Sequence, residues 1–525
     1  MLRAHTGAAV RAAEQPLLDA GAGPALMHTA AHGLRTAVVR VLRERGAPVY
    51  GSRVLVLAGA GNNGGDALYA AAGLARLGAR TTAVLTSART HPDALAAFRA
   101  AGGRVVELAT GAADPGPVDA FVNEAARADV VIDGILGTGS TGAAREPAAT
   151  VLRSMAGLLR DRHRAGRPVP SVVACDLPSG VDAGTGEVHE PVLPADRTVT
   201  FGAAKTGLFV APGALAAGAV TTIDLGIGTH LGDPDVLRLT PADLAALLPR
   251  PAAADHKYAR GVAGIVAGSA QYPGAALLAV AAASACGPGM VRYLGPGPVA
   301  ALIQARNPEA VCADLPVAGH HVQAWLAGPG IDGDATQQRR ARDVIDAGLP
   351  AVIDAAALDL LGRADAPRPH LVLTPHAGEL AALLTRLGQP TRRADVERAT
   401  LAAARRAVQL TGATVLLKGP VTLVASPTGT VFAQGDGTPS LATAGSGDTL
   451  AGILAALLAM VAEREGWGLP GVAAADRWAL AAAVGAALHG RLGRVGPDAP
   501  LNAGQLAARI PDVWAGIVRR GGTGP

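Results

Sequence analysis

The hydrophobic pattern divides this chain into a helical beginning and two long stretches in which short apolar runs alternate with alanine-rich segments. Residues 1–50 carry apolar residues at helical spacing, including Leu17, Leu26, Val38 and Val41. Beyond them, short Val, Ile and Leu runs occupy residues 54–58, 82–85, 130–132 and 172–174. Short buried strands that alternate with helices are typical of a mostly parallel sheet covered on both faces. We therefore expect an α/β domain whose ligands bind beyond the carboxyl ends of its strands.

A proline-containing segment at residues 226–255 interrupts this alternation and predicts the connection between two domains. A second series of apolar runs follows at residues 262–267, 291–294, 325–327, 351–353, 371–373 and 414–417. The 525-residue chain is also too long for a single hydrophobic core. The sequence predicts the fold class α/β, with tandem domains at residues 1–230 and 240–525.

Composition and charge argue against several kinds of protein. The chain has 46 Lys and Arg residues and 42 Asp and Glu residues, which gives a formal charge of +4. The basic residues form no dense patch in the sequence, which argues against nucleic-acid binding. The small positive excess suits an anionic small molecule as ligand. Cys175, Cys286 and Cys312 lie far apart, so we expect no disulfide framework and a cytoplasmic protein. The uncharged run at residues 449–462 is shorter than the ~20 residues of a membrane span, and the N-terminus lacks a secretory apolar stretch. We expect no membrane partner and a buried helix at 449–462.

Polar, glycine-containing loops follow the strands of the first predicted domain. The string Asn-Asn-Gly-Gly-Asp at residues 62–66 lies between the run at 54–58 and an expected helix at 67–77. Its glycines let the backbone approach a ligand, and its side chains offer oxygen ligands for a hard cation, although a capped turn is the alternative. Asp133 and Asp176 each end a later strand, and three such loops can converge on one crevice. Lys205 is a candidate to contact a phosphate or act as an acid, or else a solvated surface lysine.

The second predicted domain contains a turn that suits a phosphate. Gly445-Ser446-Gly447-Asp448 runs directly into an apolar helix, which aims backbone N–H groups and the helix dipole at one point. Asp448 can there take a proton from a hydroxyl that attacks a bound phosphate, and the alternative is an N-cap after a flexible turn. His376 is favoured as a hydrogen-bonding substrate contact rather than a zinc ligand. Residues 418–422 suit the phosphates or adenine edge of a nucleotide.

The motifs of the first domain resemble, in order and spacing, the NAD(P)H-hydrate epimerase family from about residue 26 to residue 228. The resemblance implies a Rossmann-like α/β/α sandwich and a hydrated dinucleotide substrate. The implied substrate-binding residues are Asn62, Asn63, Gly64, Gly65, Asp66, Gly137, Thr138, Gly139, Ser140, Thr141, Gly142, Ala143 and Asp176. The implied potassium (K⁺) ligands are Asn63, Asp133 and Ser179. The chain departs from the family at Ala67, where glycine is expected, and at His28, where an acidic residue is usual.

The motifs of the second domain look like those of the ADP-dependent NAD(P)H-hydrate dehydratases, over about residues 255–490. The resemblance implies a ribokinase-like α/β fold, ADP as co-substrate and Mg²⁺ to neutralise its phosphates. The implied hydrate-binding residues are Ala275, Gly330, His376 and Asp448. The implied nucleotide-binding residues are Lys418, Gly419, Pro420, Val421, Thr422 and Gly447. Ala356 stands where the family usually carries a second Asp.

Together, the two resemblances predict a bifunctional NAD(P)H-hydrate repair enzyme that we expect to be a homo-oligomer. The first domain would interconvert the R and S forms of hydrated NADH and NADPH. Asp176 would be the catalytic carboxylate that stabilises the developing positive charge and shuttles the proton, with Lys205 as a candidate partner. The second would dehydrate the S form: Asp448 deprotonates the ring hydroxyl, which attacks the terminal phosphate of ADP and leaves as phosphate. Two alternatives stay open, a small-molecule kinase on the same fold and a nucleotide-sensing first domain.

Overall fold

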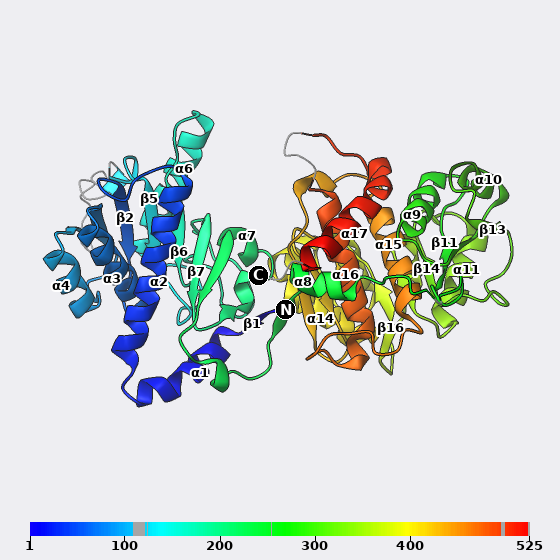
Figure 1. Cartoon of the computed structure of the whole chain (residues 1–525), viewed down its shortest axis with the longest axis horizontal. Helices are drawn as coiled ribbons and strands as arrows, with labels where there is room; N and C mark the ends of the chain where they lie inside the picture. The colour runs from blue at the N-terminus through cyan, green and yellow to red at the C-terminus, as the bar shows by residue number, and fades with distance from the viewer. Residues whose placement is uncertain (109–120, 123, 254, 495–498, 523–525) are drawn as a thin grey trace. The chain divides into compact units, whose positions relative to one another are not determined.

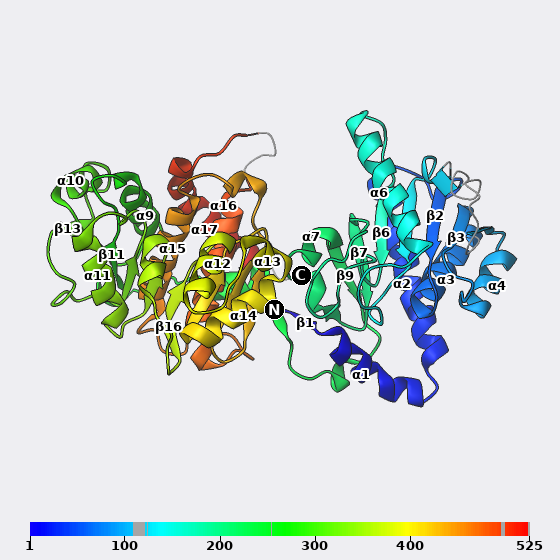
Figure 2. The same cartoon turned by 180° about the vertical axis from the view of Figure 1, so that it is seen from behind.

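The computed structural model describes residues 1–108, 121–122, 124–253, 255–494 and 499–522. The chain separates into two compact units, one formed by Arg3–Asp235 and the other by Met1–Leu2 together with Val236–Pro525. Each unit alternates strands with helices around a largely parallel sheet (Figure 1 and, from behind, Figure 2). The predicted fold class, two tandem α/β domains, is confirmed.

The N-terminal unit contains a parallel sheet whose described strands run in the order β4-β3-β2-β5-β6-β7-β9. These strands are β2 (Arg53–Ala58), β3 (Arg80–Leu85), β4 (Arg104–Glu107), β5 (Val130–Gly134), β6 (Ser171–Cys175), β7 (Arg197–Phe201) and β9 (Ala219–Ile223). The predicted apolar runs correspond to β2, β3, β5 and β6. The hydrophobic pattern misses β4, β7 and β9 because these strands mix arginine, threonine or glutamate with their apolar residues. The short strands β1 (Leu2–His5) and β8 (Ala204–Lys205) pair in parallel through Ala4 and Ala204.

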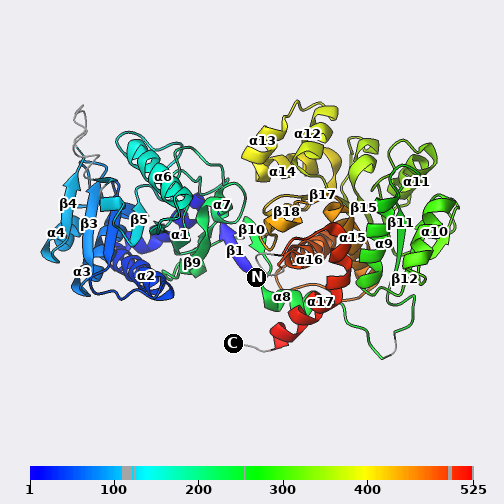
Figure 3. The same cartoon turned by 90° about the horizontal axis from the view of Figure 1, so that it is seen from above.

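Helices cover both faces of this sheet because its central strands are apolar on both sides. Val54 and Val56 of β2 belong to one buried cluster, and Leu55 and Leu57 belong to another. Helices α2, α3 and α4 pack in the first cluster and α6 in the second, and Figure 3 shows α6 across the strands from α2 and α3. The helices are α1 (Gly7–Asp19), α2 (Gly23–Glu44), α3 (Asn62–Arg76), α4 (Pro92–Ala100), α6 (Ala148–Arg164) and α7 (Gly213–Ala217), with the turns η1 (Thr206–Leu208) and η2 (Gly228–His230).

The C-terminal unit has a larger, mixed sheet in the order β13-β12-β11-β14-β15-β16-β17-β18-β19-β10. Its strands are β10 (Val236–Arg238), β11 (Val262–Val266), β12 (Met290–Leu294), β13 (Val311–Ala313), β14 (Ala324–Ala327), β15 (Ala351–Ile353), β16 (Arg368–Leu373), β17 (Ala413–Leu417), β18 (Thr422–Ala425) and β19 (Val431–Gln434). Neighbours from β13 to β17 pair in parallel, whereas β18 is antiparallel to both β17 and β19. Every apolar run predicted in this half corresponds to one of these strands.

Helices enclose this second sheet from both sides. Figure 3 shows α12, α13 and α14 on one side of β17 and β18, and α15, α16 and α17 on the other. The helices are α8 (Pro241–Leu247), α9 (Pro273–Ala285), α10 (Gly297–Arg306), α11 (Ala335–Asp346), α12 (Ala377–Arg386), α13 (Arg393–Arg398), α14 (Thr400–Thr411), α15 (Ser446–Val461), α16 (Arg477–Leu492) and α17 (Leu506–Gly522). Short turns are η3 (Ala355–Leu360), η4 (Pro439–Leu441), η5 (Ala474–Asp476) and η6 (Ala503–Gln505).

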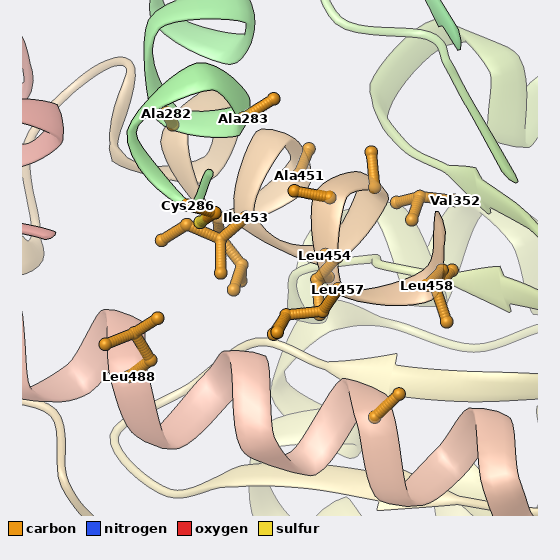
Figure 4. Close-up of a cluster of buried hydrophobic side chains, with 14 of the residues drawn as sticks. Ala282, Ala283, Cys286, Val352, Ala451, Ile453, Leu454, Leu457, Leu458 and Leu488 are labelled. Atoms are coloured by element: carbon orange, nitrogen blue, oxygen red, sulfur yellow. The ribbon is translucent and has the colours of Figure 1, made fainter. Parts of the chain in front are cut away.

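Helix α15 lies in the centre of the C-terminal core. Every residue from position 449 to position 461 is buried, which confirms the predicted buried helix. Figure 4 shows its side chains between Leu488 of α16 and a group formed by Ala282 and Ala283 of α9 and by Cys286, which follows that helix. Gly452 allows α15 to approach α9 closely, because an added Cβ would lie 2.2 Å from the carbonyl oxygen of Ala279. In the described part of the chain, neither α15 nor any other helix is long and apolar enough to cross a bilayer.

We expect Gly452→Ala to lower the free energy of unfolding of the C-terminal unit by about 1–3 kcal/mol, because the added methyl group pushes α15 away from α9. Gly516→Ala in α17 is the matched control, since its added Cβ has no heavy atom within 4 Å. That control should raise stability by roughly 0.5–1 kcal/mol because alanine favours the helix. Denaturant unfolding followed by circular dichroism measures both. A Gly452→Ala protein as stable as the wild type would contradict the close helix contact.

Two candidate active sites

A cavity of about 740 Å³ opens at the carboxyl ends of β2, β5 and β6 in the N-terminal unit. The loops that follow these strands line it, as expected for a parallel sheet. Of the substrate-binding residues implied by the sequence, those that line the cavity are Asn62, Asn63, Asp66, Gly137, Thr138, Gly139, Ser140 and Asp176. The others, Gly64, Gly65, Thr141, Gly142 and Ala143, lie beside them in the same two segments without lining it.

The Asn-Asn-Gly-Gly-Asp string forms the first turn of α3 rather than a loop before it. The helix begins at Asn62, earlier than the expected start at residue 67. Gly61 precedes it with a φ of 80°, a conformation that glycine adopts without strain. An added Cβ on Gly59 would lie 2.0 Å from the carbonyl oxygen of Ile135, so only glycine fits between these two loops. The free N–H groups of the helix N-terminus therefore lie at the cavity, where they favour an anion.

Asp176 lines the cavity and is held by an extensive set of hydrogen bonds. Its φ of 67° places it in the left-handed region, which is uncommon for a residue other than glycine. Oδ2 accepts from the backbone N of Thr138 at 2.8 Å and from Thr138 Oγ1 at 2.5 Å. Oδ1 accepts from Thr200 Oγ1 at 3.1 Å and from Lys205 Nζ at 2.6 Å. Both carboxylate oxygens are therefore engaged by donors from the loop after β5 and from strands β7 and β8.

Lys205 is a buried ion-pair partner of Asp176 and not a surface lysine. Its side chain is 1% exposed. Nζ also donates to Thr200 Oγ1 at 3.0 Å and to the carbonyl oxygen of Phe201 at 2.7 Å, so all three ammonium protons have acceptors. Burial alone would raise the pKa of Asp176, but the Lys205 charge and the hydrogen bonds from Lys205 and Thr138 outweigh it and hold that pKa below its usual range. The pair is therefore ionised.

The implied potassium ligands gather beneath the same loops. Asp133 is fully buried and accepts from the backbone N of Ser179 at 2.8 Å and from Ser179 Oγ at 2.7 Å. Both polar side-chain atoms of Asn63 are buried without a hydrogen-bond partner. An added Cβ on Gly137 would lie 3.1 Å from Asn63 Oδ1, which places the Asn63 amide beside the β5 loop. The structure joins Asp133 to Ser179 directly and leaves the Asn63 amide oxygen free for a cation.

Helices α1 and α2 contribute cavity residues that no sequence motif reveals. Arg11 and Glu14 come from α1, and His28 comes from α2. Tyr69 of α3 lies between two histidines, with ring centroids 4.8 Å from His28 and 6.2 Å from His91. The only sequence signal for this aromatic group is that His28 stands where the family usually has an acidic residue. Residues that come together from separate helices have no fixed spacing along the sequence, so no motif predicts their contact. The described residues contain no group of three or more His, Cys, Asp or Glu side chains arranged to hold a metal ion.

In the C-terminal unit, Asp448 lies in the first turn of α15 beside the glycine turn that begins the helix. Gly445 has a φ of 87°, which favours glycine. An added Cβ on Gly445 would lie 3.9 Å from Asp448 Oδ2, so the carboxylate lies next to this turn. Ser446 Oγ lies 3.0 Å from His489 Nε2 and ties the turn to α16. The backbone N of Ser446 donates to the carbonyl oxygen of Thr443 at 3.2 Å, whereas those of Gly447 and Asp448, which precede the first intrahelical bond from Thr449 to Gly445, are left for a ligand.

Several charged side chains surround Asp448. Lys418 Nζ lies 2.9 Å from Asp354 Oδ1 and 3.5 Å from Glu379 Oε2. It also lies 3.6 Å from where a Cβ on Gly447 would stand, which places the ammonium beside the glycine turn. Burial raises the pKa of Asp448 to about 6, and the charges of Asp354 and Glu379 add to this rise while Lys418 opposes it. A carboxylate with this pKa is a suitable general base near neutral pH.

The residues implied to bind the hydrate form two groups in the structure. Ala275 and Gly330 are adjacent, since a Cβ on Gly330 would lie 2.8 Å from the Cβ of Ala275. His376 instead lies beside Lys418, with which it forms an isolated backbone bridge. Its Nδ1 caps α12 by accepting from the backbone N of Gly378 at 3.0 Å and of Glu379 at 3.1 Å. His376 is exposed, so its Nε2 edge is accessible to a ligand.

The segment implied to bind the nucleotide is the tight connection between β17 and β18. Lys418 follows β17, Gly419 and Pro420 are exposed, Val421 is buried and Thr422 begins β18. The backbone N of Lys418 donates to the carbonyl oxygen of Pro375 at 2.9 Å. Ala356, at the position of the expected second Asp, lies half-buried in η3 and offers no carboxylate. Asp354 and Glu379 are the acidic groups that pair with Lys418.

Lys205→Met should leave the Asp176 carboxylate buried without its counter-charge. Removing one member of a buried ion pair costs about 3–5 kcal/mol, so we expect the N-terminal unit to unfold at a lower denaturant concentration. The double variant Lys205→Met/Asp176→Asn is the control and should recover most of the loss, because it removes the unpaired charge. Circular dichroism during denaturant unfolding measures both. A Lys205→Met protein with the wild-type midpoint would show that the pair contributes nothing to folding.

Comparison with known proteins identifies relatives along nearly the whole chain. A family described as NAD(P)H-hydrate dehydratase matches residues 263–511, and one described as YjeF-related protein N-terminus matches residues 23–207. The bifunctional NAD(P)H-hydrate repair enzyme Nnr of Mycobacterium leprae (strain TN) is 40% identical over 523 residues, which cover 98% of this chain and 99% of that protein. The protein of the same name from Mycobacterium tuberculosis (strain ATCC 25618 / H37Rv) is 41% identical over 458 residues, with coverage of 86% and 88%.

Among solved structures, the ADP/ATP-dependent NAD(P)H-hydrate dehydratase from Bacillus subtilis, co-crystallised with ATP and Mg²⁺, is 28% identical to this chain. That match has a TM-score of 0.46 and covers 53% of this chain and 98% of the other. The sequence identity to the two mycobacterial proteins extends over both units and both sites. This chain therefore belongs to the family of bifunctional NAD(P)H-hydrate repair enzymes.

Proposed function

We propose that this protein repairs hydrated nicotinamide cofactors by two reactions, one in each α/β unit. Residues 1–230 interconvert the R and S hydrates of NADH and NADPH, and residues 240–525 dehydrate the S form at the expense of ADP. The observation that carries the proposal is the position of Asp448. Its carboxyl has a pKa of about 6 and lies at the N-terminus of a buried helix, among the charges of Lys418, Asp354 and Glu379.

In the dehydratase reaction, Asp448 accepts the proton of the ring hydroxyl while that oxygen attacks the terminal phosphate of ADP. The backbone N–H groups of the 445–447 turn, apart from that of Ser446, donate to the phosphoryl oxygens as the transfer proceeds. The lone pair of the ring nitrogen then expels phosphate, and the cationic ring loses a proton from the neighbouring ring carbon, which restores the reduced nicotinamide and leaves AMP. Phosphate is a far better leaving group than hydroxide, which is the reason for consuming a nucleotide.

The remaining residues of this site divide between the two substrates. For the nucleotide we assign Lys418, Gly419, Pro420, Val421, Thr422 and Gly447, with Lys418 balancing phosphate charge. For the hydrate we assign Ala275, Gly330 and His376, whose Nε2 edge is accessible. Mg²⁺ usually binds substrate phosphates with one or two carboxylates, and Asp354 and Glu379 offer carboxylates beside Lys418. When bound, Mg²⁺ would neutralise phosphate charge.

In the epimerase reaction, the ionised Asp176 stabilises the positive charge that develops on the nicotinamide ring when the hydroxyl departs. The nucleotide lies along residues 62–66 and 137–143, where the N-terminus of α3 favours its phosphates. We assign Asn63, Asp133 and Ser179 as the K⁺ ligands, because the buried amide oxygen of Asn63 has no other partner. A K⁺ ion there would hold the β2 and β5 loops together.

We also propose that the protein is cytoplasmic and assembles as a homo-oligomer. Cys175, Cys286 and Cys312 are all unpaired thiols, which suits a reducing compartment. The oligomer is proposed from the fold class, in which exposed sheet edges and helices commonly provide contacts.

Exchanging each carboxylate for its amide should separate the two activities. We expect Asp448→Asn to lose about 10²-fold or more of the dehydration rate while epimerisation continues, because only the base of one unit is removed. Asp176→Asn should do the reverse. Recovery of the reduced-nicotinamide absorbance from hydrated NADH, with ADP, Mg²⁺ and K⁺, measures dehydration, and chromatography of the two epimers measures epimerisation. A stable phosphorylated metabolite as product would instead identify a small-molecule kinase.

The dehydration rate should fall as the pH drops through about 6, the pKa of Asp448, because the base must be ionised. Asp354→Asn should move this fall to lower pH, since the Asp354 charge raises the pKa of Asp448. Asp359→Asn is the matched control, because Asp359 is an exposed residue of the neighbouring turn η3. A pH profile of kcat for each variant measures the shift. Identical profiles for the wild type and Asp354→Asn would contradict the charge coupling.

A further inference from the structure

Epimerisation of a hydrate needs a group that moves a proton to and from the departing hydroxyl, and Asp176 is poorly placed to do so. Its two oxygens already accept four hydrogen bonds, and the Lys205 ammonium holds it ionised. Lys205 has all three protons engaged by Asp176, Thr200 and Phe201. Another group in the same cavity must therefore handle the proton. The following inference rests on the proposed epimerase function of this unit.

Glu14 reaches the cavity from α1, a helix that is fixed against the site. Thr6 caps the start of α1, with Oγ1 accepting from the backbone N of Ala9 at 3.2 Å. At Gly7 the helix contacts the β5 loop so closely that an added Cβ would lie 2.9 Å from Thr138 Cγ2. One turn before Glu14, Arg11 Nη1 donates to the carbonyl oxygen of Thr138 at 2.5 Å. This places α1 beside the same residue whose amide and hydroxyl bind Asp176.

The face of α1 next to Glu14 is buried, which leaves Glu14 on the cavity edge. Val10 and Ala13 pack with Ala203 and Ile227 in a small apolar cluster. Helical spacing then places positions 11, 14 and 18 on the edge that lines the cavity, as observed. The Glu14 side chain is thereby presented to the ligand by a rigid element rather than by a loop.

Glu14 has the features of a proton-transfer group. Neither of its carboxyl oxygens makes a hydrogen bond or ion pair with a described residue, and its side chain is half-buried. Burial raises the pKa of Glu14; Lys205 and Arg11 oppose this rise and Asp176 adds to it. The charged groups that face it are therefore Arg11 on its own helix and Asp176 and Lys205 across the cavity. Asp66, on α3, also lines the cavity.

We propose that Glu14 is the proton donor and acceptor of the epimerisation. The protonated carboxyl gives its proton to the ring hydroxyl as the carbon–oxygen bond breaks, and the oxygen leaves as water with both bonding electrons. The lone pair of the ring nitrogen forms a carbon–nitrogen double bond, and the cationic ring faces the Asp176 carboxylate. Water then adds to the opposite face of the same carbon, and its surplus proton returns to the Glu14 carboxylate through solvent. The cycle balances without an oxidant, a reductant or a nucleotide.

Accessibility favours Glu14 over Asp66 for this role. Asp66 lines the cavity but is 8% exposed, and its Oδ1 is buried without a hydrogen-bond partner, so it has little contact with solvent. A group that exchanges its proton in every turnover has to meet both the substrate and solvent. Glu14, half-buried on the cavity edge, meets both conditions.

The test compares Glu14→Gln with Asp19→Asn, an acid-to-amide change at an exposed position of the same helix. Purified R hydrate is incubated with the full chain without ADP, and the appearance of the S form is followed by chromatography. We expect Glu14→Gln to reduce kcat by 10²-fold or more with little change in KM, and Asp19→Asn to have no effect. Dehydration of purified S hydrate with ADP should be normal in both variants.

A pH profile distinguishes proton transfer from a structural role. In the wild type, the epimerisation rate should decrease as the pH rises through the pKa of Glu14, because the protonated form starts the reaction. This decrease at high pH should be absent in Glu14→Gln. The shorter acid in Glu14→Asp should retain more activity than the amide. A Glu14→Gln protein that epimerises at the wild-type rate, or whose rate decreases at high pH as in the wild type, overturns the inference. A wild-type protein that does not epimerise overturns the proposed function, and this inference with it.

Discussion

Contact between backbones at a few glycines fixes both candidate sites. Gly59 lets the β2 loop touch the β5 loop at Ile135, and Gly452 lets α15 lie against α9 at Ala279. In each case a single added methyl group would meet a backbone carbonyl oxygen, which cannot move away as a side chain could. These contacts position the loop that leads into α3 and the helix α15, and the N-terminus of a helix favours the phosphates of a ligand.

The two units use a carboxylate in opposite electrostatic states. Asp176 is held ionised by the buried Lys205, and its pKa lies below the usual range. Asp448 lies among other carboxylates, and burial together with Asp354 and Glu379 raises its pKa to about 6 despite the nearby Lys418. The first state suits stabilisation of a positive charge, and the second suits acceptance of a proton near neutral pH. This contrast gives each unit its own part in the repair of a hydrated cofactor.

The lysine in each site takes its state from its surroundings. Lys205 is buried with all its protons engaged, so it is a fixed counter-charge and has no N–H donor left for a ligand. Lys418 is shared between Asp354 and Glu379 at longer distances and lies beside the turn at Gly447. In the proposed mechanism, it is therefore the lysine that exchanges a carboxylate for a phosphate when a nucleotide binds. The same residue type thus has different roles in the two sites.

The sequence alone determined the tandem α/β class, the buried helix α15, the motif residues at strand ends and ten of the strands, which are β2, β3, β5, β6, β11, β12, β14, β15, β16 and β17. These features depend on local spacing, which the folded chain cannot alter. Tertiary structure alone decided that Lys205 meets Asp176, that Lys418 meets Asp354, and that Glu14 and Tyr69 join the first cavity. It also decided that the Asn-Asn-Gly-Gly-Asp string is helical and that the mixed-polarity segments β4, β7 and β9 are strands. Such features depend on partners far away in the chain, and packing against those partners outweighs the local pattern.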